Sequence, residues 1–543
     1  MSVQDSASYL RGKAATDASV SRMILNSSID ALFDQALQRH DAGQLAEALL
    51  LYDAIIGASP KNAVVFNNRG LALQGLARFE AAVASYEQAI ALHPNYAEAY
   101  ANRGDALQML NRLREAVTSY DRALALNPDI AEIYLNRGGA HHKLGNFSAA
   151  VADYDRSIAL SPASAESYAN RGLTLMELGR VDDALADFKK VDRRSPVYAE
   201  AALNAFGLCL SELHNQPPIE EMAAEAERVV IAKTCDDLSR EKCMLDFQVL
   251  HDLEQTCHLI ESGYDTPGLR RLRERLERIY ARRSPSSAQE INNRIALTND
   301  EIADINAFRK TPLRYRGESF VGACLNPDND WHALEEQYLA SSPEIISIDN
   351  FLTPSALTEL LRFCLISTAW RKAYDGQYLG AFAEGGFFSP LHRQIAHELR
   401  IRMPRIFSEH PLRQLWSFKC MAAKHRGLKV HADFARVNLN FWLTPDDANL
   451  DPTSGGMIVH DIAAPGDWSF KDYNNDEKGQ EDRIYGFLRA RGANRIKIPY
   501  RCNRAVLFNS NLFHETDQFH FKDGYENRRI NVTYLFGNGL KTP

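Results

Sequence analysis

Three side chains in the last quarter of the sequence have the types and spacing of a metal-binding group. His431 and Asp433 are separated by one residue in KVHADFARVNLNFWLTP, and among the 16 histidines only His431 is followed two places on by a carboxylate. Because alternate residues of a strand point to one face, both side chains can reach one ion. His514 follows at the end of the apolar run AVLFNSNLFH, which we expect to be a single strand. The pattern predicts a metal site.

The ligand set indicates the kind of metal. Two histidines and one carboxylate occupy one face of an ion and leave three positions open, which is typical of non-haem iron(II) sites, although zinc or nickel also accept such ligands. His520 is an alternative to His514 as the distal ligand. His460, in IVHD, is expected to be a strand-end histidine near the pocket.

A lone arginine follows the metal pattern. Arg529 lies 15 residues beyond His514 and opens the apolar strand RINVTYLF. A guanidinium inside a barrel is costly unless an anion meets it, and a carboxylate can accept two of its hydrogen bonds. Arg528 is the alternative, but its side chain would point to the opposite face. We therefore expect Arg529 to bind a dicarboxylate.

Short strands must position these side chains. From about residue 343 the apolar runs EIISIDNFL, RIKIPY, AVLFNS and INVTYLFG are separated by turn residues. A strand-rich region flanked by helices is typical of a jelly-roll barrel, which can carry ligands on facing strands. The polar stretch 461–494 between strands is expected to form a lid or a substrate-recognition surface.

Residues 344–538 resemble the 2-oxoglutarate- and iron(II)-dependent oxygenases, and the prolyl-hydroxylase-like branch in particular. The resemblance is carried by EIISIDNFLTPSALTELL, by HAD at the start of the metal strand, by NFWLTPDDANLDPTSGGMIVH with its two glycines, and by FNSNLFHE. It implies a double-stranded β-helix, or jelly roll. This chain has Cys420 and Met421 where many members of the branch carry a tyrosine.

The resemblance also implies roles for single residues. His431, Asp433 and His514 would hold Fe(II), and Arg529 would bind the C5 carboxylate of the cosubstrate 2-oxoglutarate. Asn531 and Thr533, which share the face of Arg529 on the strand, would support the cosubstrate. The carboxylate of Asp433 argues against a halogenase, because that branch leaves this position open for chloride.

The first two hundred residues repeat with a period of 34. Gapless 34-residue segments begin at Ala63, Ala97, Ala131 and Ala165, and each predicts two amphipathic helices, the second ended by proline. Prolines recur at Pro60, Pro94, Pro128, Pro162 and Pro196. Aromatic residues keep the same period at Tyr52, Tyr86, Tyr120, Tyr154 and Phe188. Glycines recur where two helices need to approach closely, at Gly70, Gly104, Gly138 and Gly172. The pattern resembles a tetratricopeptide repeat array.

An asparagine recurs on the first helix of each repeat. These residues are Asn68, Asn102, Asn136, Asn170 and Asn204. In the repeat array of O-GlcNAc transferase, which this ladder resembles, such asparagines line the concave groove and bind a peptide backbone. The alternative role is hydrogen bonding between repeats. The arginines that follow them are expected to pair with acidic neighbours rather than to form a basic stripe: Arg69, Arg103, Arg137 and Arg171.

The whole chain is predicted to be multidomain, with an α-helical part followed by an α+β part. An N-terminal extension covers residues 1–28, a tetratricopeptide solenoid 29–214, a helical connector 215–342 and the jelly-roll oxygenase domain 343–543. In the connector, LRRLRERLERIYARR predicts a helix with one apolar face and a solvated or interdomain arginine face, broken by SPSS.

Composition excludes several classes of function. The 543 residues include 62 basic and 70 acidic side chains, and the net charge of −8 argues against binding to nucleic acid or to an anionic membrane. No apolar run reaches the length of a membrane span. The 8 cysteines form no CxxC pair, which indicates a reducing compartment and therefore a cytoplasmic protein.

These observations together predict a 2-oxoglutarate-dependent dioxygenase that hydroxylates a protein or peptide presented by the repeat array. One alternative is an oxygenase that acts on a small molecule or glycan while the repeats recruit partners. A second is a non-catalytic adaptor with a degenerate barrel. A glycosyltransferase is excluded, because the remaining sequence is too short for two nucleotide-sugar domains. The substrate, the residue modified and the oligomeric state stay open.

Overall fold

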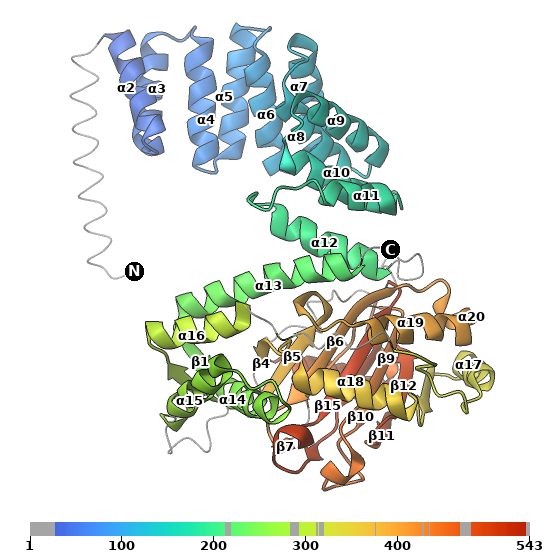
Figure 1. Ribbon diagram of the computed structural model, residues 1–543. Coiled ribbons are helices and arrows are strands. Elements are labelled where there is room, and N and C mark those ends of the chain that lie inside the picture. Colours follow the sequence, from blue (N-terminus) through green and yellow to red (C-terminus); the bar gives the residue numbers. More distant parts are fainter. Residues whose placement is uncertain are drawn as a thin grey trace. The chain divides into compact units, whose positions relative to one another are not determined.

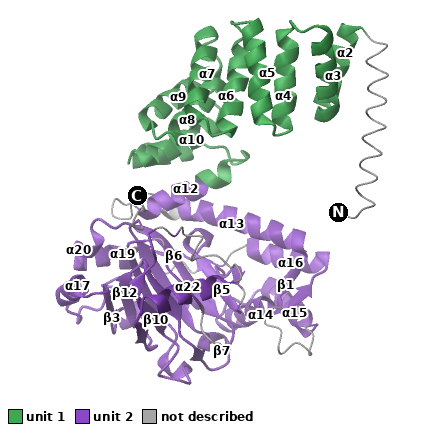
Figure 2. Cartoon of the chain, turned by 180° about the vertical axis from the view of Figure 1, so that it is seen from behind, with its two compact units in different colours: residues 1–201 green, residues 202–543 purple. Residues whose placement is uncertain are grey.

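The computed structural model describes residues 28–538 (Figure 1). Within this span the residues not described are 212–218, 283–292, 311–312, 314–319, 375, 426–427, 434, 467 and 469–478. The chain forms two compact units, residues 1–201 and 202–543 (Figure 2). Apart from Ser28, the N-terminal extension predicted over residues 1–28 lies outside the described residues.

The first unit is a stack of helix pairs, as the 34-residue period predicts (Figure 1). Its helices are α2 (Ile29–Asp41), α3 (Leu45–Ala58), α4 (Ala63–Gly75), α5 (Phe79–Leu92), α6 (Ala97–Met109), α7 (Leu113–Leu126), α8 (Ala131–Lys143), α9 (Phe147–Leu160), α10 (Ala165–Glu177) and α11 (Val181–Phe188). Helix α12 (Tyr198–Ser211) spans the boundary between the units, which therefore lies earlier than the predicted boundary after residue 214. The reason is packing, because Phe206 of α12 contacts Phe388 within the second unit.

The recurring glycines allow the two helices of each repeat to touch. A Cβ atom on Gly104 would lie 2.5 Å from Cε1 of Tyr120, the fully buried aromatic residue of the second helix. The same contact recurs between Gly138 and Tyr154 at 2.8 Å, and between Gly172 and Phe188 at 2.7 Å. Such distances are too short for a side chain, so the aromatic ring and the missing Cβ are complementary parts of one interface.

The region between the repeats and the C-terminal strands belongs to the second unit. Its helices are α13 (Ile219–Glu241), α14 (Asp246–Glu261), α15 (Pro267–Ala281), α16 (Asn299–Lys310) and α17 (Trp331–Ala340). The prediction of a purely helical connector is wrong in one respect, because β1 (Cys243–Leu245) pairs antiparallel with β2 (Arg294–Ala296). These strands are only 3 residues long, too short to give a visible alternation in the sequence. No helix among the described residues is long and apolar enough to cross a membrane.

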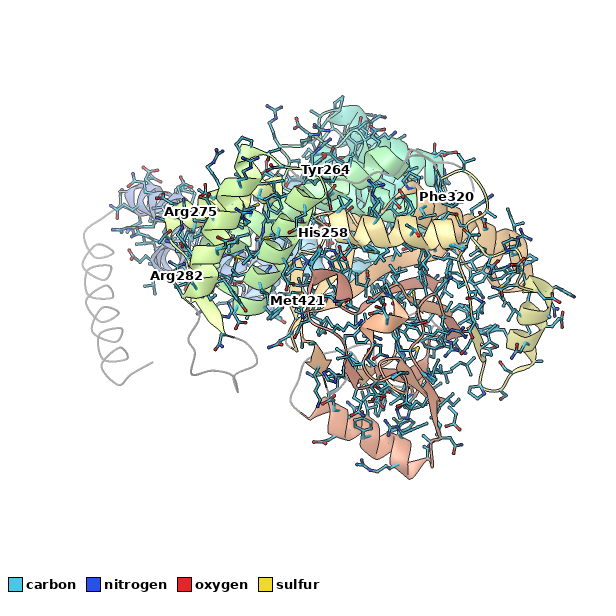
Figure 3. The ribbon with its side chains drawn as sticks, turned by 60° about the horizontal axis from the view of Figure 1, so that its bottom comes forward. His258, Tyr264, Arg275, Arg282, Phe320 and Met421 are labelled. Carbon is cyan, nitrogen blue, oxygen red and sulfur yellow. The ribbon has the colours of Figure 1, made fainter. Side chains whose placement is uncertain are left out.

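The arginine-rich helix is α15. Its predicted apolar face is buried, with Leu272 5% and Ile279 0% exposed. Two arginines, labelled in Figure 3, pair with acidic residues of α16: Arg275 of α15 with Asp304 at 2.7 Å, and Arg282, the residue after α15, with Glu301 at 2.9 Å. This charged face is therefore partly neutralised within the unit itself. The predicted break at SPSS lies outside the described residues.

The second unit contains two large antiparallel sheets. The seven-stranded sheet has the order β3 (Ile345–Ile348), β12 (Ala505–Asn509), β9 (Val437–Trp442), β15 (Ile530–Phe536), β6 (Leu412–Cys420), β5 (Tyr378–Phe382) and β4 (Lys372–Tyr374). The four-stranded sheet has the order β11 (Arg495–Ile498), β10 (Met457–Ala463), β13 (Leu512–Thr516) and β8 (Leu428–His431). The four runs predicted to be strands correspond to β3, β11, β12 and β15.

The core of this unit joins inward-facing residues of both sheets. One apolar cluster includes Val506 and Phe508 of β12 together with Met457 and Val459 of β10. Helices α18 (Pro354–Ile366) and α19 (Pro390–Arg402) precede β6, and His392 of α19 lies against Tyr534 on the outer face of β15, with ring centroids 6.2 Å apart. The central strand β15 is thus buried on both faces.

A lysine is buried on the outer face of the seven-stranded sheet. Lys419 of β6 is 0% exposed, and its Nζ atom lies 4.6 Å and 4.1 Å from the ring centroids of Trp370 and Tyr525. The nearest acceptor is the carbonyl oxygen of Cys364 at 3.5 Å, and no carboxylate in the described part of the chain forms an ion pair with it. Burial lowers the pKa of Lys419 from 10.5 to about 7.

This lowered pKa makes Lys419 destabilising when it is charged. Because the folded pKa lies below the unfolded value, the penalty is complete below pH 7 and is relieved as the pH rises toward 10.5. We expect Lys419→Met to raise the free energy of unfolding by about 1 to 4 kcal/mol at neutral pH, and by less near pH 10. Chemical denaturation across this pH range measures the difference, with exposed Lys424→Met as the control. A gain independent of pH would contradict the assignment.

Candidate metal centre

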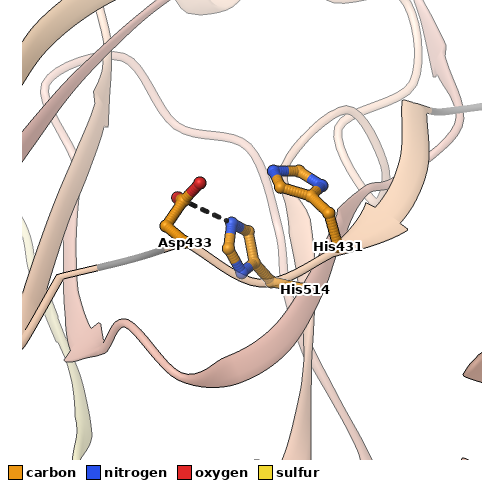
Figure 4. A group of neighbouring side chains, drawn as sticks. All are labelled: His431, Asp433 and His514. Carbon is orange, nitrogen blue, oxygen red and sulfur yellow. Dashed lines mark ion pairs between the residues drawn. The ribbon is translucent and has the colours of Figure 1, made fainter. Parts of the chain in front are cut away.

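The three predicted metal ligands lie together in the structure (Figure 4). One ligand atom from each of His431, Asp433 and His514 lies within 4.8 Å of the other two. The Nε2 atom of His514 is 3.4 Å from Oδ2 of Asp433, and the two imidazole centroids are 4.4 Å apart. Asp433 and His514 are each 5% exposed. Among the described residues this is the one cluster of three or more such side chains that could hold a metal ion.

Backbone carbonyls orient both imidazoles. The Nδ1 atom of His431 is 2.9 Å from the carbonyl oxygen of Lys429, and Nδ1 of His514 is 3.0 Å from that of Leu512. A carbonyl only accepts, so each Nδ1 carries the proton and each Nε2 has a free lone pair. Burial lowers the pKa of His431, which favours this neutral form. Both rings are therefore held in the tautomer that binds a metal through Nε2.

Asn438 of β9 supports the carboxylate. Its Nδ2 atom donates to Oδ2 of Asp433 at 2.7 Å. Burial acts to raise the pKa of Asp433, but the adjacent rings of His514 and His431 and the hydrogen bond from Asn438 outweigh it, so the pKa lies below its ordinary value. The carboxylate is thus ionised and held in place. Sequence reasoning missed Asn438, although an asparagine on the inward face of the apolar strand VNLNFW was a signal for it.

Strand pairing brings the two histidines together. His514 of β13 is the direct partner of His431 of β8. Two details differ from the prediction. Asp433 lies beyond the end of β8, where its backbone N–H donates to the carbonyl oxygen of Ser510. His514 is the middle residue of β13 rather than the end of one long strand, because the run 505–516 turns at Ser510 and Asn511 and passes from the seven-stranded sheet to the four-stranded sheet.

The insertion between β10 and β11 supports the metal strands from behind. Its helix α22 (Gln480–Ala490) buries Ile484 and Leu488 against Val430 of β8 and Phe513 of β13. These strand residues alternate with the histidines, so α22 covers the face opposite to the ligands. The predicted lid over the pocket is therefore wrong for this helix, and residues 469–478 of the insertion lie outside the described residues.

Arg529 is buried between the sheets, as predicted. It is 2% exposed and donates to the carbonyl oxygens of Gly455 at 2.7 Å and Gly456 at 3.3 Å, and to Oδ1 of Asn531 at 3.3 Å. In the described part of the chain, no carboxylate forms an ion pair with this guanidinium. Burial lowers the pKa of Arg529, because the charged guanidinium is less stable in this buried environment than in water. A permanent cation in such a place provides a site for an anion.

The other inward residues of β15 continue this polar face. Asn531 and Thr533 are 6% and 2% exposed, and Oγ1 of Thr533 accepts a hydrogen bond from Nδ2 of Asn440 at 3.0 Å. Asn440 lies two residues after Asn438 on β9, so it shares the face that reaches Asp433. The inward face of these two strands therefore carries polar groups from the metal ligands to Arg529.

The alternatives left open by the sequence lie elsewhere. His520 is exposed on β14 (Phe519–His520), which pairs with β7 (Lys424–His425) and not with the metal strands. Arg528 points to the opposite face of the sheet, where it binds Oε1 of Glu254 at 2.8 Å. His460 also faces outward, with Nε2 3.3 Å from Oε1 of Glu515. It therefore lies on the face of the sheet opposite to the metal ligands, not beside them as predicted.

In the repeat array, two asparagines of the predicted ladder form bonds between repeats. Nδ2 of Asn102 donates to Oδ1 of Asn67 at 3.0 Å, and Nδ2 of Asn136 donates to Oδ1 of Asp105 at 2.9 Å. Asn68 instead donates to the carbonyl oxygen of Val64 within its own helix. The ladder members are half-buried, and Asn204 lies on α12 in the second unit: Asn68, Asn102, Asn136, Asn170 and Asn204.

Three of the four recurring arginines pair with acidic residues, as expected from the structural interpretation. Arg137 binds Asp121 at 2.6 Å and Asp153 at 2.5 Å. Arg171 repeats this arrangement one period later, with Asp155 and Asp187. Arg69 has a single carboxylate partner, Asp53, and Arg103 donates to the hydroxyl of Ser119. A basic stripe for an acidic peptide is therefore absent from the described array.

Comparison with known families agrees with this geometry for the repeats. Residues 104–165 and 165–198 match models described as tetratricopeptide repeat, and residues 78–111 match one described as TPR repeat. The N-terminal region is a tetratricopeptide repeat array. Such repeats generally bind peptides or proteins. No curated protein matches the chain.

Several solved structures are similar to part of the chain. PilW, a type IV pilus biogenesis factor, is 27% identical with a TM-score of 0.33, covering 37% of this chain and 93% of its own. MamA is 26% identical with a TM-score of 0.28, covering 29% and 91%. YrrB, a TPR protein with an unusual peptide-binding site, is 24% identical with a TM-score of 0.30, covering 33% and 91%.

The role of Asn438 can be tested by metal binding. We expect Asn438→Ala to weaken binding of cobalt(II) about 10- to 100-fold, because Asp433 loses the donor that fixes its carboxylate. Titration followed by the visible absorption of cobalt measures the affinity. Asn440→Ala on the same face of β9 is the control, because Asn440 contacts Thr533 and not a ligand. Equal loss in both variants would show that general loosening of β9 is responsible.

Proposed function

We propose that the second unit is an iron(II)- and 2-oxoglutarate-dependent hydroxylase with a double-stranded β-helix fold, and that its substrate is a protein or peptide bound by the repeat array. One observation carries the proposal. The space between the two sheets holds both a two-histidine, one-carboxylate cluster and a buried arginine that has no acidic partner among the described residues.

The donor set fits iron(II). Two imidazoles and one carboxylate are the ligands of facial sites that leave positions open for other molecules. The tautomers are fixed by the carbonyls of Lys429 and Leu512, so both Nε2 atoms are available without rearrangement of the backbone. Asn438 likewise orients the carboxylate of Asp433, through a hydrogen bond. These outer contacts preorganise the ligands for a metal.

The remaining polar face fits 2-oxoglutarate. Arg529 would bind the distal carboxylate, because its guanidinium forms no ion pair with a carboxylate in the described chain and donates to carbonyl and amide oxygens instead. Asn531 and Thr533 are on the inward face of β15, between Arg529 and the metal ligands. When bound, iron and 2-oxoglutarate together supply the oxidising power to insert one oxygen atom of O2 into a substrate C–H bond.

The residues of the protein would bind and orient the cosubstrate and shield it from water. The apolar cluster of Met457, Val459, Val506 and Phe508 excludes water from the region between the sheets. Exclusion of water strengthens the interaction of Arg529 with a carboxylate, because both charges are then poorly screened. It also keeps reactive species away from solvent.

The repeat array supports a protein or peptide substrate. Asn102 and Asn136 each use an amide N–H between repeats, and their Oδ1 atoms have no partner among the described residues. An amide oxygen in this position can accept a hydrogen bond from a peptide backbone without reading its sequence. Tetratricopeptide repeats generally bind peptides or proteins, which makes this array the natural place for a substrate.

Turnover of 2-oxoglutarate tests the enzymatic proposal. We expect the full-length protein with iron(II) and ascorbate to form succinate, and His431→Ala or His514→Ala to lower the rate about 100-fold or more, since each removes a metal ligand. His520→Ala is the matched control, because this exposed histidine lies outside the cluster. Absence of any succinate, or equal rates in the wild type and His431→Ala, would favour a non-catalytic adaptor.

Mass spectrometry tests the proposed role of the array. Proteins that gain one oxygen atom with the wild type, but not with His514→Ala, are candidate substrates. We expect the triple variant Asn102→Ala, Asn136→Ala and Asn170→Ala to lower their modification about tenfold, while succinate formation without substrate is unchanged. Arg114→Ala, an exposed change on a second helix, is the control. Unchanged modification in the triple variant would point to a small-molecule or glycan substrate.

A further inference from the structure

The indole of Trp442 is a buried donor without an acceptor. Trp442 is the last residue of β9 and is 0% exposed, and its Nε1 atom has no hydrogen-bond partner among the described residues. Trp331 and Trp370, by contrast, donate to backbone carbonyl oxygens at 2.9 and 2.8 Å. Buried indole N–H groups usually find a partner, because an unsatisfied donor is costly. The N–H group of Trp442 is therefore available to a ligand.

The surroundings of Trp442 indicate what this ligand is. The guanidinium carbon of Arg529 lies 5.9 Å from the centroid of the Trp442 ring, and Trp442 is the direct cross-strand partner of Asn531. Tyr500, whose ring centroid is 5.6 Å from that of Trp442, already donates its hydroxyl to the carbonyl oxygen of Thr444. Phe519 covers Arg529 on another side, at 5.6 Å, and offers no acceptor atom.

Two unsatisfied features thus lie side by side. Among the described residues, Arg529 has no carboxylate partner and the N–H group of Trp442 has no acceptor. Both side chains lie in the interior between the two large sheets. A single carboxylate satisfies both, because its two oxygens offer about four lone-pair sites. A neutral ligand would leave the charge of Arg529 uncompensated, and a metal ion would be repelled by it.

We propose that the indole N–H of Trp442 donates a hydrogen bond to the same carboxylate that Arg529 binds. This inference rests on the proposed function and identifies the group as the distal carboxylate of 2-oxoglutarate. Trp442 then discriminates between 2-oxo acids, because it contacts only those with a second carboxylate.

Packing alone does not account for this tryptophan. A phenylalanine at residue 442 could lie against Tyr500 and the neighbouring apolar cluster without burying an N–H group. The donor is therefore the part of the indole that needs an explanation. A hydrogen bond to a charged group is stronger than one to a neutral group, so its loss should weaken binding of the dicarboxylate about 10- to 100-fold.

Calorimetry on the full-length protein loaded with zinc(II) tests the inference. The probes are 2-oxoglutarate and 2-oxobutyrate, which share the C1 carboxylate and the keto group but differ in the distal carboxylate. We expect Trp442→Phe to weaken 2-oxoglutarate about 10- to 100-fold and to leave the weaker binding of 2-oxobutyrate unchanged. Trp331→Phe is the matched control, because this buried indole already has an acceptor.

Nuclear magnetic resonance gives a second readout that needs no stable variant at residue 442. The chain has 5 tryptophans, so indole ¹⁵N labelling gives five N–H signals. Phenylalanine at each of the other four positions assigns the Trp442 signal by elimination. We expect this signal to move downfield with 2-oxoglutarate and zinc(II), and to stay in place with 2-oxobutyrate, because only the dicarboxylate accepts its hydrogen bond.

The outcomes separate this inference from the proposed function. If the wild type binds 2-oxoglutarate but the Trp442 signal does not move, or Trp442→Phe binds it equally well, the inference fails and the hydroxylase remains. Equal weakening of both 2-oxo acids also overturns it, because that result assigns Trp442 a packing role. If the zinc-loaded wild type binds neither acid, the proposed function itself is wrong.

Discussion

The pairing of β8 with β13 is the constraint on which the second unit depends. It sets His431 opposite His514, and a shift of one residue in either strand would turn an imidazole to the outer face. The register is fixed from both sides. The short turn between β12 and β13 connects the strand of His514 to the seven-stranded sheet, and α22 covers the outer face with Ile484 and Leu488. The cluster thus depends on both large sheets and on α22.

The same alternation gives the seven-stranded sheet two different faces. Arg529 and Cys420 face the interior, whereas the adjacent Arg528 and Lys419 face the helices outside. Arg528 is neutralised there by Glu254 of α14. The segment predicted as a connector therefore supplies a counter-charge for the strand that carries Arg529, which explains why it belongs to the second unit and not to a separate linker.

Local patterns made much of this structure predictable. The 34-residue repeat needs only contacts between neighbouring segments, so its glycines and aromatic residues could be assigned from spacing alone. Strand alternation likewise predicts that Arg529, Asn531 and Thr533 share one face, because they are two residues apart. The cluster of His431, Asp433 and His514 also followed from residue types.

The sequence did not reveal which residues of different strands lie next to each other. Asn438 reaches Asp433, and Trp442 lies beside Arg529, only because of the register between β9 and its neighbours. The turn at Ser510 and Asn511 was hidden in a continuous apolar run, so one strand was predicted where two exist. The position of α22 behind the metal strands depends on packing, which polarity alone does not reveal.

The arginines of the array have a consequence for how it can grow. Arg137 and Arg171 each join a carboxylate on the second helix of the preceding repeat to one on the second helix of their own. Every such repeat therefore carries one arginine for its predecessor and one aspartate for its successor. A duplicated 34-residue unit meets complementary charges at both of its ends. Because of this charge pattern, a duplicated repeat can lengthen the array during evolution and still form ion pairs with the repeats on both sides of it.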